Sequence, residues 1–194
     1  MYPDPADVTR VTSIGAGPIG GGWTAHFLSR GYDVTAYLHH VDETDAFRAI
    51  LDTAWASLTD LGLAEGASLD RLRIVTDIEE ALDGAQFVQE SAPERLEIKQ
   101  ALYQQMGEIL PSSVVIGSST SGLTMSEIQA TCPTPERTVI AHPFNPPYLL
   151  PLVEIVGGDK TSPDAVAWVG RFFEVAGKAP LLMKKEIPGF VATR

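Results

Sequence analysis

The chain has 194 residues, of which 44% are hydrophobic, 20% charged and 8% aromatic. These proportions are typical of a globular protein of one or two domains, and they exclude disordered, collagen-like and coiled-coil classes. Acidic residues outnumber basic residues by 25 to 14, and the formal net charge of -11 would repel phosphate backbones and anionic lipid headgroups. We therefore expect neither a nucleic acid nor a membrane as a partner.

Compartment signals favour the cytoplasm. The single cysteine, Cys132, has no partner within the chain for a disulfide. Residues 1–5 have neither the cationic start nor the apolar run of a signal peptide. No stretch approaches the ~20 consecutive apolar residues that span a bilayer. We expect a soluble, cytoplasmic protein.

Short β-branched runs alternate with segments of helical period along the chain. A strand at 11–14 is followed by a glycine-rich turn and a helix over 23–29, and then by a strand at 34–38. Apolar residues then recur every three or four positions, which predicts a helix over 44–61 that Gly62 ends. Further strands are predicted at 72–75, 87–90, 114–117, 139–141, 152–156 and 180–184.

This alternation implies parallel strand pairing through right-handed crossovers. The predicted fold class is α/β, with a Rossmann-type, doubly wound and mostly parallel sheet that helices cover on both faces. Residues 1–186 contain no internal repeat or linker, and we expect them to form one domain.

Gly15, Gly17 and Gly20 fit the pattern G-x-G-x-x-G, between the first predicted strand and the first predicted helix. In that context the first glycine permits a tight turn, the second lets the backbone approach a pyrophosphate, and the third lets helix and strand pack closely. The helix N-terminus adds free N–H groups and a positive dipole end. With Pro18 and Ile19 completing the turn, the motif predicts a dinucleotide site.

The second predicted strand ends at Leu38, where dinucleotide-binding folds usually carry an acidic residue for the adenosine ribose. Three arrangements are open: Asp42 or Glu43 reaches the ribose from a longer loop, the ribose is held differently, or His39 and His40 accept a 2'-phosphate. We predict NAD, in preference to NADP, as the cofactor.

His142 follows the predicted strand 139–141, at the edge where open α/β sheets bind ligands. Glu154 comes twelve positions later, on a strand that can return beside the first. A carboxylate that accepts from one imidazole nitrogen fixes the tautomer and strengthens the other nitrogen as a base for an alcohol proton. The alternatives are a proline-rich turn with a capping histidine, and an edge-strand charge at Glu154.

Two further polar segments follow predicted strand ends. The segment 118–122 places hydroxyl groups toward the same crevice, or caps a helix that begins near Thr124. Glu94, in the segment 90–95, is either an acid in the first turn of a helix or a contact to the ribose or nicotinamide of the cofactor.

Taken in chain order, the motifs at 15–20, 94–99, 119–121, 142–146, 152–154 and 188–190 resemble the 3-hydroxyacyl-CoA dehydrogenase superfamily, from about Val11 to Arg194. The resemblance implies NAD-dependent oxidation of a 3-hydroxyl to a 3-keto group, without a metal. It implies a catalytic dyad of His142 and Glu154, assisted by Ser121 and Asn145. The cofactor contacts that it implies are Gly15, Gly17, Pro18, Ile19, Gly20, Leu38, Glu94, Lys99 and Ser119.

Within the superfamily, the segments 90–95, 118–122 and 142–151 look most like the L-carnitine dehydrogenase branch, with the gulonate dehydrogenase/lambda-crystallin branch as a near neighbour. Acyl-CoA enzymes of the family carry a lysine-rich helical pair for the CoA phosphates, whereas residues 41–69 here hold no lysine and only Arg48. We expect oxidation of L-carnitine to 3-dehydrocarnitine. The alternatives are 3-hydroxybutyryl-CoA, L-gulonate, and a catalytically silent structural or binding protein.

The segment 187–194 looks like the entry into a new helix. The resemblance implies that it begins a helical C-terminal domain, through which family members form homodimers and complete the pocket for a small hydroxy substrate. We therefore expect the 194-residue chain to bind cofactor but to turn over poorly.

Overall fold

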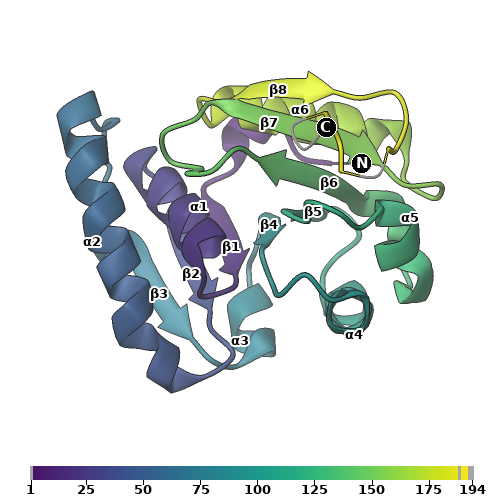
Figure 1. Ribbon diagram of the computed structural model, residues 1–194, viewed down its shortest axis with the longest axis horizontal. Helices are drawn as coiled ribbons and strands as arrows, with labels where there is room; N and C mark the ends of the chain where they lie inside the picture. Colours follow the sequence, from purple (N-terminus) through teal and green to yellow (C-terminus); the bar gives the residue numbers. More distant parts are fainter. Residues whose placement is uncertain (1, 188, 192–194) are drawn as a thin grey trace.

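The computed structural model describes residues 2–187 and 189–191 (Figure 1). The strands are β1 Arg10–Ile14, β2 Asp33–Tyr37, β3 Leu72–Val75, β4 Phe87–Glu90, β5 Val115–Ser118, β6 Thr138–Pro143, β7 Leu152–Gly157 and β8 Ala179–Leu182. The α-helices are α1 Pro18–Ser29, α2 Thr44–Leu61, α3 Ile78–Leu82, α4 Leu96–Ile109, α5 Met125–Ile128 and α6 Pro163–Val175. Short 3-10 turns lie at Pro5–Asp7, Val41–Glu43, Leu69–Arg71, Gln129–Thr131 and Pro135–Arg137.

The strands form one sheet in the order β3-β2-β1-β4-β5-β6-β7-β8. Every neighbouring pair is parallel except β6 and β7. From β1 the chain first builds outward through β2 and β3, and then crosses to β4 on the other side of β1. The carboxyl ends of β1 and β4 thus border the crevice in which doubly wound folds bind ligands, and the predicted fold class is confirmed.

The antiparallel β7 departs from the parallel pairing that the strand–helix alternation implied. Only eight residues, 144–151, connect β6 to β7, whereas a parallel crossover takes about a dozen or more. The chain therefore turns back on itself. β8 is parallel to β7 again because α6 provides the crossover between them.

Most predicted elements lie within two residues of the observed ones. The helix over 44–61 is confirmed, and Gly62 ends it with a φ of 98°, a conformation that favours glycine. α1 begins at Pro18, five residues before the predicted start at 23, because a proline in the first turn has its φ preset for a helix.

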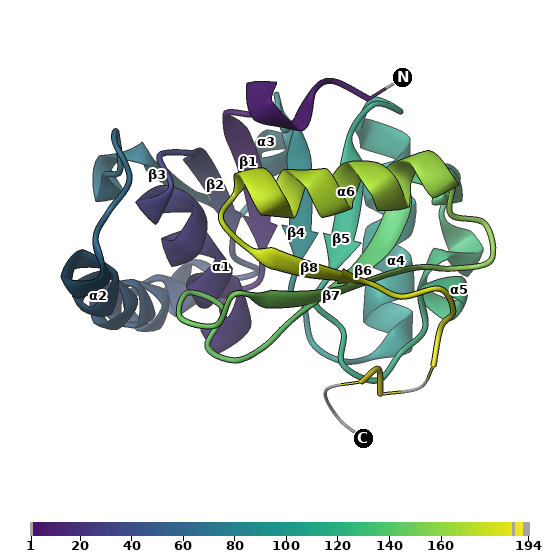
Figure 2. The same ribbon diagram turned by 90° about the horizontal axis from the view of Figure 1, so that it is seen from above.

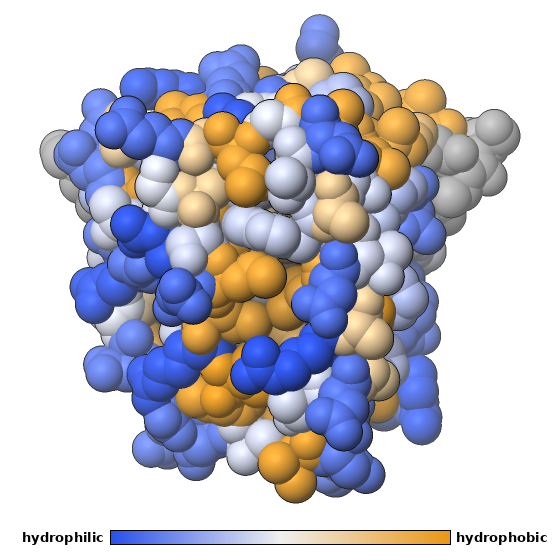
Figure 3. Space-filling model, turned by 90° about the vertical axis from the view of Figure 1, so that its left-hand side faces the viewer, coloured by the Kyte–Doolittle hydropathy of each residue, from blue (hydrophilic) through white to orange (hydrophobic). Residues whose placement is uncertain are grey.

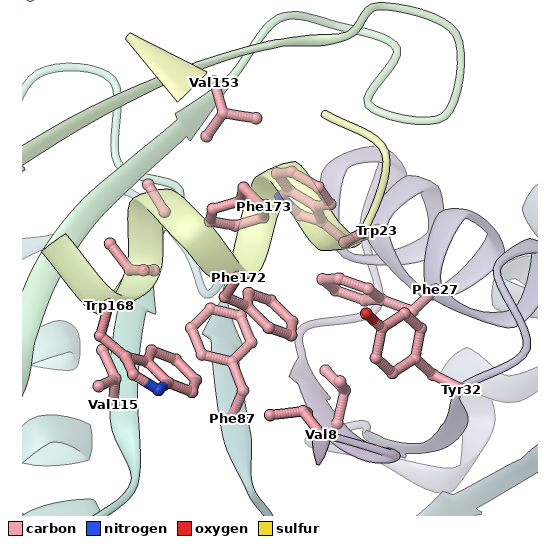
Figure 4. Packing of buried hydrophobic residues seen from close by; sticks show 14 of the residues in the cluster. Val8, Trp23, Phe27, Tyr32, Phe87, Val115, Val153, Trp168, Phe172 and Phe173 are labelled. Carbon is pink, nitrogen blue, oxygen red and sulfur yellow. The ribbon is translucent and has the colours of Figure 1, made fainter. Parts of the chain in front are cut away.

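Helices cover both faces of the sheet (Figures 1 and 2). α1 and α6 pack on one face and α3, α4 and α5 on the other, each over its own apolar cluster. Figure 4 shows how the first cluster is built from aromatic rings of β4, α1 and α6. The rings of Phe87 and Phe172 lie 4.3 Å apart, and those of Trp23 and Phe173 lie 5.3 Å apart. This packing fixes α1, and with it the glycine turn, against the sheet.

The side of the molecule formed by α2 carries an apolar area in its middle, with hydrophilic side chains around it (Figure 3). A cavity of about 450 Å³ lies between α2 and the loop that follows β6. Within the described residues, no helix is both long and apolar enough to cross a membrane.

Candidate active site

The turn between β1 and α1 is shaped by three glycines. Gly15 has a φ of 117°, and a Cβ atom there would lie 2.4 Å from the carbonyl oxygen of Ser91. A Cβ atom on Gly20 would lie 2.1 Å from the carbonyl oxygen of Gly15. A Cβ atom on Gly17, in contrast, would have no atom of the chain within 4 Å. Two close approaches and one open position are what a pyrophosphate-binding turn requires, so this turn fits NAD.

The first turn of α1 points its N–H groups toward this open side of the loop. Gly17 is the N-cap and offers no side-chain cap, and Pro18 follows it at the first helical position. Ile19 is partly buried against the aromatic cluster below. An anion at this helix end would therefore meet backbone donors and the positive end of the helix dipole.

A cavity of about 510 Å³ extends from the glycine turn to the end of β2. In this fold the adenosine half of a dinucleotide lies there. The side chains that line the cavity include Tyr37, His39, Glu43, Pro93, Glu97 and Leu102.

Leu38, for which a cofactor contact was predicted, does not line this cavity. Leu38 is fully buried, and its side chain packs in the apolar cluster under α2, away from the cavity. The neighbours that do line the cavity are His39 and Glu43. A carboxylate oxygen of Glu43 accepts from the N–H of His40 at 3.0 Å, which holds this acid at the cavity wall.

His142 and Glu154 face each other across β6 and β7. Nδ1 of His142 lies 2.8 Å from Oε2 of Glu154, and the two side chains are buried. Because a carboxylate only accepts, the ring proton lies on Nδ1 and leaves Nε2 with a free lone pair. Oγ of Ser121 lies 3.1 Å from Nε2 and donates to it. Three of the four predicted catalytic residues therefore form one hydrogen-bonded array.

The turn that carries Ser121 is held by Glu94. One oxygen of Glu94 accepts from the Thr120 hydroxyl at 2.5 Å and from the N–H groups of Ser121 and Gly122 at 2.8 and 2.9 Å. Partial burial raises the pKa of Glu94, but these hydrogen bonds and the charge of Lys99 outweigh it, so the pKa lies below its ordinary value. Glu94 is a carboxylate that fixes the backbone of the serine turn.

Lys99, for which a cofactor contact was predicted, is bound within the protein at the ends of β4 and β5. Nζ of Lys99 is buried, 2.6 Å from Oε1 of Glu90, and donates to the carbonyl oxygen of Ala92 at 3.1 Å. The other oxygen of Glu90 accepts from the Ser118 hydroxyl at 2.6 Å. The ammonium group is thus enclosed between α4 and the ends of β4 and β5, where it stabilises the polar turns.

Ser119 connects the glycine-turn side of the site to the serine turn. Its hydroxyl accepts from Nε1 of Trp23 at 3.1 Å and from Nε2 of Gln89 at 2.7 Å, and lies 2.8 Å from the Ser91 hydroxyl.

Trp23 and Gln89 were not assigned to the site from the sequence. Gln89 carried a signal, since it is the polar residue of a strand that is otherwise apolar up to Glu90, whereas Trp23 reads as a core residue.

Asn145 is not brought to the dyad. It is exposed on the loop after β6 and lines the 450 Å³ cavity against α2, together with Ile50 and Tyr148. Within the part of the chain that the structure describes, its side chain makes no hydrogen bond to His142 or Ser121.

The described residues also contain no group of three His, Cys, Asp or Glu side chains that could hold a metal ion.

Residues 10–187 match the sequence profile of the family "3-hydroxyacyl-CoA dehydrogenase, NAD binding domain". The chain belongs to this family. The predicted membership and the prediction of NAD as cofactor are thereby confirmed, and the glycine turn and the adjoining cavity fit that cofactor.

Individual proteins and solved structures resemble the chain closely. The L-carnitine dehydrogenase of Streptomyces coelicolor is 54% identical over 190 residues, which are 98% of this chain and 60% of that protein. The structure of an NAD+-dependent dismutase, 5-formyl-3-hydroxy-2-methylpyridine 4-carboxylic acid 5-dehydrogenase, has a TM-score of 0.87 and 32% identity, over 95% of this chain and 60% of that chain. The 3-hydroxybutyryl-CoA dehydrogenase of Escherichia coli has the same TM-score and identity, over 96% of this chain and 40% of that chain. The chain thus spans 60% or less of the length of these relatives.

Proposed function

We propose that the chain is the cofactor-binding part of an NAD-dependent dehydrogenase that oxidises a secondary 3-hydroxyl to a 3-keto group. The observation that carries the proposal is the array of Ser121, His142 and Glu154, with contacts of 3.1 and 2.8 Å. The array lies at the carboxyl edge of the sheet, the same edge as the glycine turn.

In this proposal Nε2 of His142 takes the proton of the substrate hydroxyl. Glu154 holds the Nδ1–H tautomer and balances the positive charge that develops on the ring. The Ser121 hydroxyl stands next to Nε2 and hydrogen-bonds the reacting oxygen, which orients it toward the base. Bound NAD supplies the hydride acceptor.

Gly15, Gly17, Pro18, Ile19 and Gly20 hold the pyrophosphate in this proposal, through the backbone of the turn and the first turn of α1. Glu94 and Ser119 border the nicotinamide side. Two sets of hydrogen bonds support that placement. Glu94 accepts from the N–H groups of Ser121 and Gly122, and Ser119 accepts from Trp23 of α1. Asn145 contacts the reacting oxygen or the carboxamide only after the loop that carries it has moved toward the dyad.

The proposed substrate is L-carnitine. The similarity to an L-carnitine dehydrogenase over nearly the whole chain supports this choice. Arg48 is the only cationic residue of α2, so this helix offers little charge for the phosphates of coenzyme A. The formal net charge of -11 favours a substrate that carries a positive charge. Tyr148 lines the cavity against α2 and offers an aromatic face to a trimethylammonium group.

We also propose that residues 1–186 form the NAD-binding domain and that the region beginning at 187 completes the substrate pocket and forms a homodimer; residues 188 and 192–194 of that region lie outside the described residues. The end of the family match at residue 187 supports this division.

The experiment that tests the proposal is NADH formation with L-carnitine, 3-hydroxybutyryl-CoA and L-gulonate as substrates. It is run on the 194-residue chain and, where the reading frame continues, on the longer product. A preference for L-carnitine supports the proposal. A preference for the CoA ester overturns the choice of L-carnitine as substrate but leaves the proposed catalytic dyad in place. If the longer product turns over none of the three substrates, the proposed dehydrogenase activity is overturned.

A further inference from the structure

The segment that follows β8 returns to the dyad. Figure 2 shows it running down to the edge of the sheet at which β4 and β5 end. The ring of Phe190 lies 5.2 Å from the ring of His142, with an angle of 39° between the two planes. Phe190 is fully buried, in the apolar cluster that also holds residues of α4 and α5. The segment is therefore packed into the site rather than lying on the surface.

Phe190 adopts an uncommon backbone conformation. Its φ of 49° lies in the left-handed region, a conformation that is unfavourable in free energy for a residue with a Cβ atom. The turn is nevertheless closed by a hydrogen bond from the N–H of Phe190 to the carbonyl oxygen of Ile187 at 3.0 Å. This conformation brings the ring onto the imidazole and directs the next N–H group toward Glu154.

The N–H of Val191 donates to Oε1 of Glu154 at 2.8 Å. The other oxygen, Oε2, accepts from Nδ1–H of His142, also at 2.8 Å. Both oxygens of the buried carboxylate are thus engaged, one by the base and one by the backbone of the segment after β8. Rotation of the carboxylate would break both hydrogen bonds.

We propose that Phe190 and the backbone N–H of Val191 are positioning elements of the His142–Glu154 dyad. The Val191 amide fixes the carboxylate, and the Phe190 ring keeps water from the bond between Nδ1 and Oε2. Together they hold His142 as the Nδ1–H tautomer, with Nε2 free to act as the base. The expected effect on turnover rests on the proposed dehydrogenase function, whereas the expected tautomer of His142 does not.

The first test uses a matched pair at position 191. Val191→Pro removes the amide donor, and Val191→Ala keeps it. The Val191 side chain is 55% exposed, so both variants are expected to fold. The readout is the ratio of Nδ1–H to Nε2–H tautomer of His142 from its ring nitrogen-15 shifts, assigned by their loss in His142→Asn. We expect the ratio to fall about tenfold in Val191→Pro and to stay unchanged in Val191→Ala.

A second pair tests the ring independently, because a proline at 191 also restricts the residue before it. Phe190→Gly removes the ring and accepts the positive φ, and Phe190→Leu keeps an apolar cover. The tautomer ratio is expected to fall in the glycine variant and to be largely restored in the leucine variant. An unchanged ratio in either Val191→Pro or Phe190→Gly overturns the proposal.

The same variants separate this inference from the proposed function. Where the enzyme turns over, Val191→Pro is expected to lower kcat about tenfold with little change in KM, because the loss concerns the base and not substrate binding. A shifted tautomer ratio in a protein that oxidises no hydroxy substrate contradicts the dehydrogenase and leaves the positioning role in place.

Discussion

His142 and Glu154 are directly opposite partners in the register of β6 and β7. Opposite residues of an antiparallel pair share one face of the sheet, with their Cβ atoms ~5 Å apart. The turn back after β6 is therefore what makes the dyad, since a parallel crossover at this point would have carried Glu154 to another strand position. Two residues twelve positions apart thereby become a buried acceptor and a base with a defined tautomer.

Gly17 and Gly20 are expected to respond differently to alanine. A Cβ atom on Gly17 meets no atom of the chain, so Gly17→Ala should keep or slightly raise the stability, by up to ~1 kcal/mol, while it weakens NAD binding about tenfold or more. A Cβ atom on Gly20 collides with the Gly15 carbonyl, so Gly20→Ala should cost ~1–3 kcal/mol of stability. Urea unfolding and calorimetric titration with NAD check both values. Equal NAD affinity of Gly17→Ala and the unmodified chain would show that the pyrophosphate lies elsewhere.

Glu43, rather than Asp42, is expected to disfavour NADP. Glu43 lines the adenosine cavity and is held there by the His40 N–H. A carboxylate beside a 2'-phosphate repels it, so Glu43→Ala should raise the affinity for NADP relative to NAD about tenfold, ~1.4 kcal/mol. Asp42→Ala is the matched control and should leave the ratio unchanged. The same shift in both variants would contradict the assignment.

Glu94 is expected to act on turnover through Ser121. Glu94→Ala removes the acceptor of the Thr120 hydroxyl and of two backbone N–H groups in the serine turn. We expect kcat to fall about ten- to a hundredfold, because Ser121 no longer holds its place beside His142. Glu108→Ala, on the exposed side of α4, is the control. Steady-state kinetics with L-carnitine check the difference, and equal kcat values for the two variants would remove Glu94 from the site.

Lys178 is expected to make stability depend on pH. Burial, and then the charge of Arg30, lowers the pKa of Lys178 to about 8. Its Nζ donates to the carbonyl oxygens of Pro147 and Leu150, in the loop between β6 and β7. The unfolded chain, in which the group titrates at its ordinary value of 10.5, binds more protons between these two values. The contribution of Lys178 to stability therefore rises as the pH increases from about 8 to 10.5 and is constant below about 8.

Urea unfolding of Lys178→Met at pH values on both sides of this window measures that contribution. The rise in stability relative to pH 7 should be smaller in Lys178→Met than in the unmodified chain. Lys160→Met, at an exposed position, should retain the full rise. An identical pH dependence in all three proteins would contradict the burial of a charged Lys178.

The fold was predictable because its signals are local. The apolar period over 44–61 and Gly62 defined α2, and the glycine pattern after a β-branched run defined the turn before α1. The direction of β7 was less accessible, since it depends on the length of the connection after β6. A periodic pattern does not encode that relationship.

The site was predictable where a residue type carries chemistry of its own. His142, Glu154 and Ser121 were named, and the structure brings them together. The surroundings of Leu38 and Lys99 were not predictable, because a resemblance transfers a position but not the direction in which a side chain points. Leu38 faces the core and Lys99 pairs with a buried carboxylate.

Phe190 was named only within the family motif at 188–190, without a role in the site, and Val191 was not named. A phenylalanine and a valine near the end of a chain carry no chemical signal in the sequence. Their part in the site depends on a backbone turn and on an amide group that every residue except proline possesses.

Nε2 of His142 is the base that we propose takes the hydroxyl proton. The most direct test is NADH formation from L-carnitine by His142→Asn, in the longest product of the reading frame, beside NAD affinity measured on the same protein. We expect kcat/KM to fall about a hundredfold or more, while the affinity for NAD stays within about twofold. Unchanged kcat/KM in His142→Asn would show that another group takes the proton.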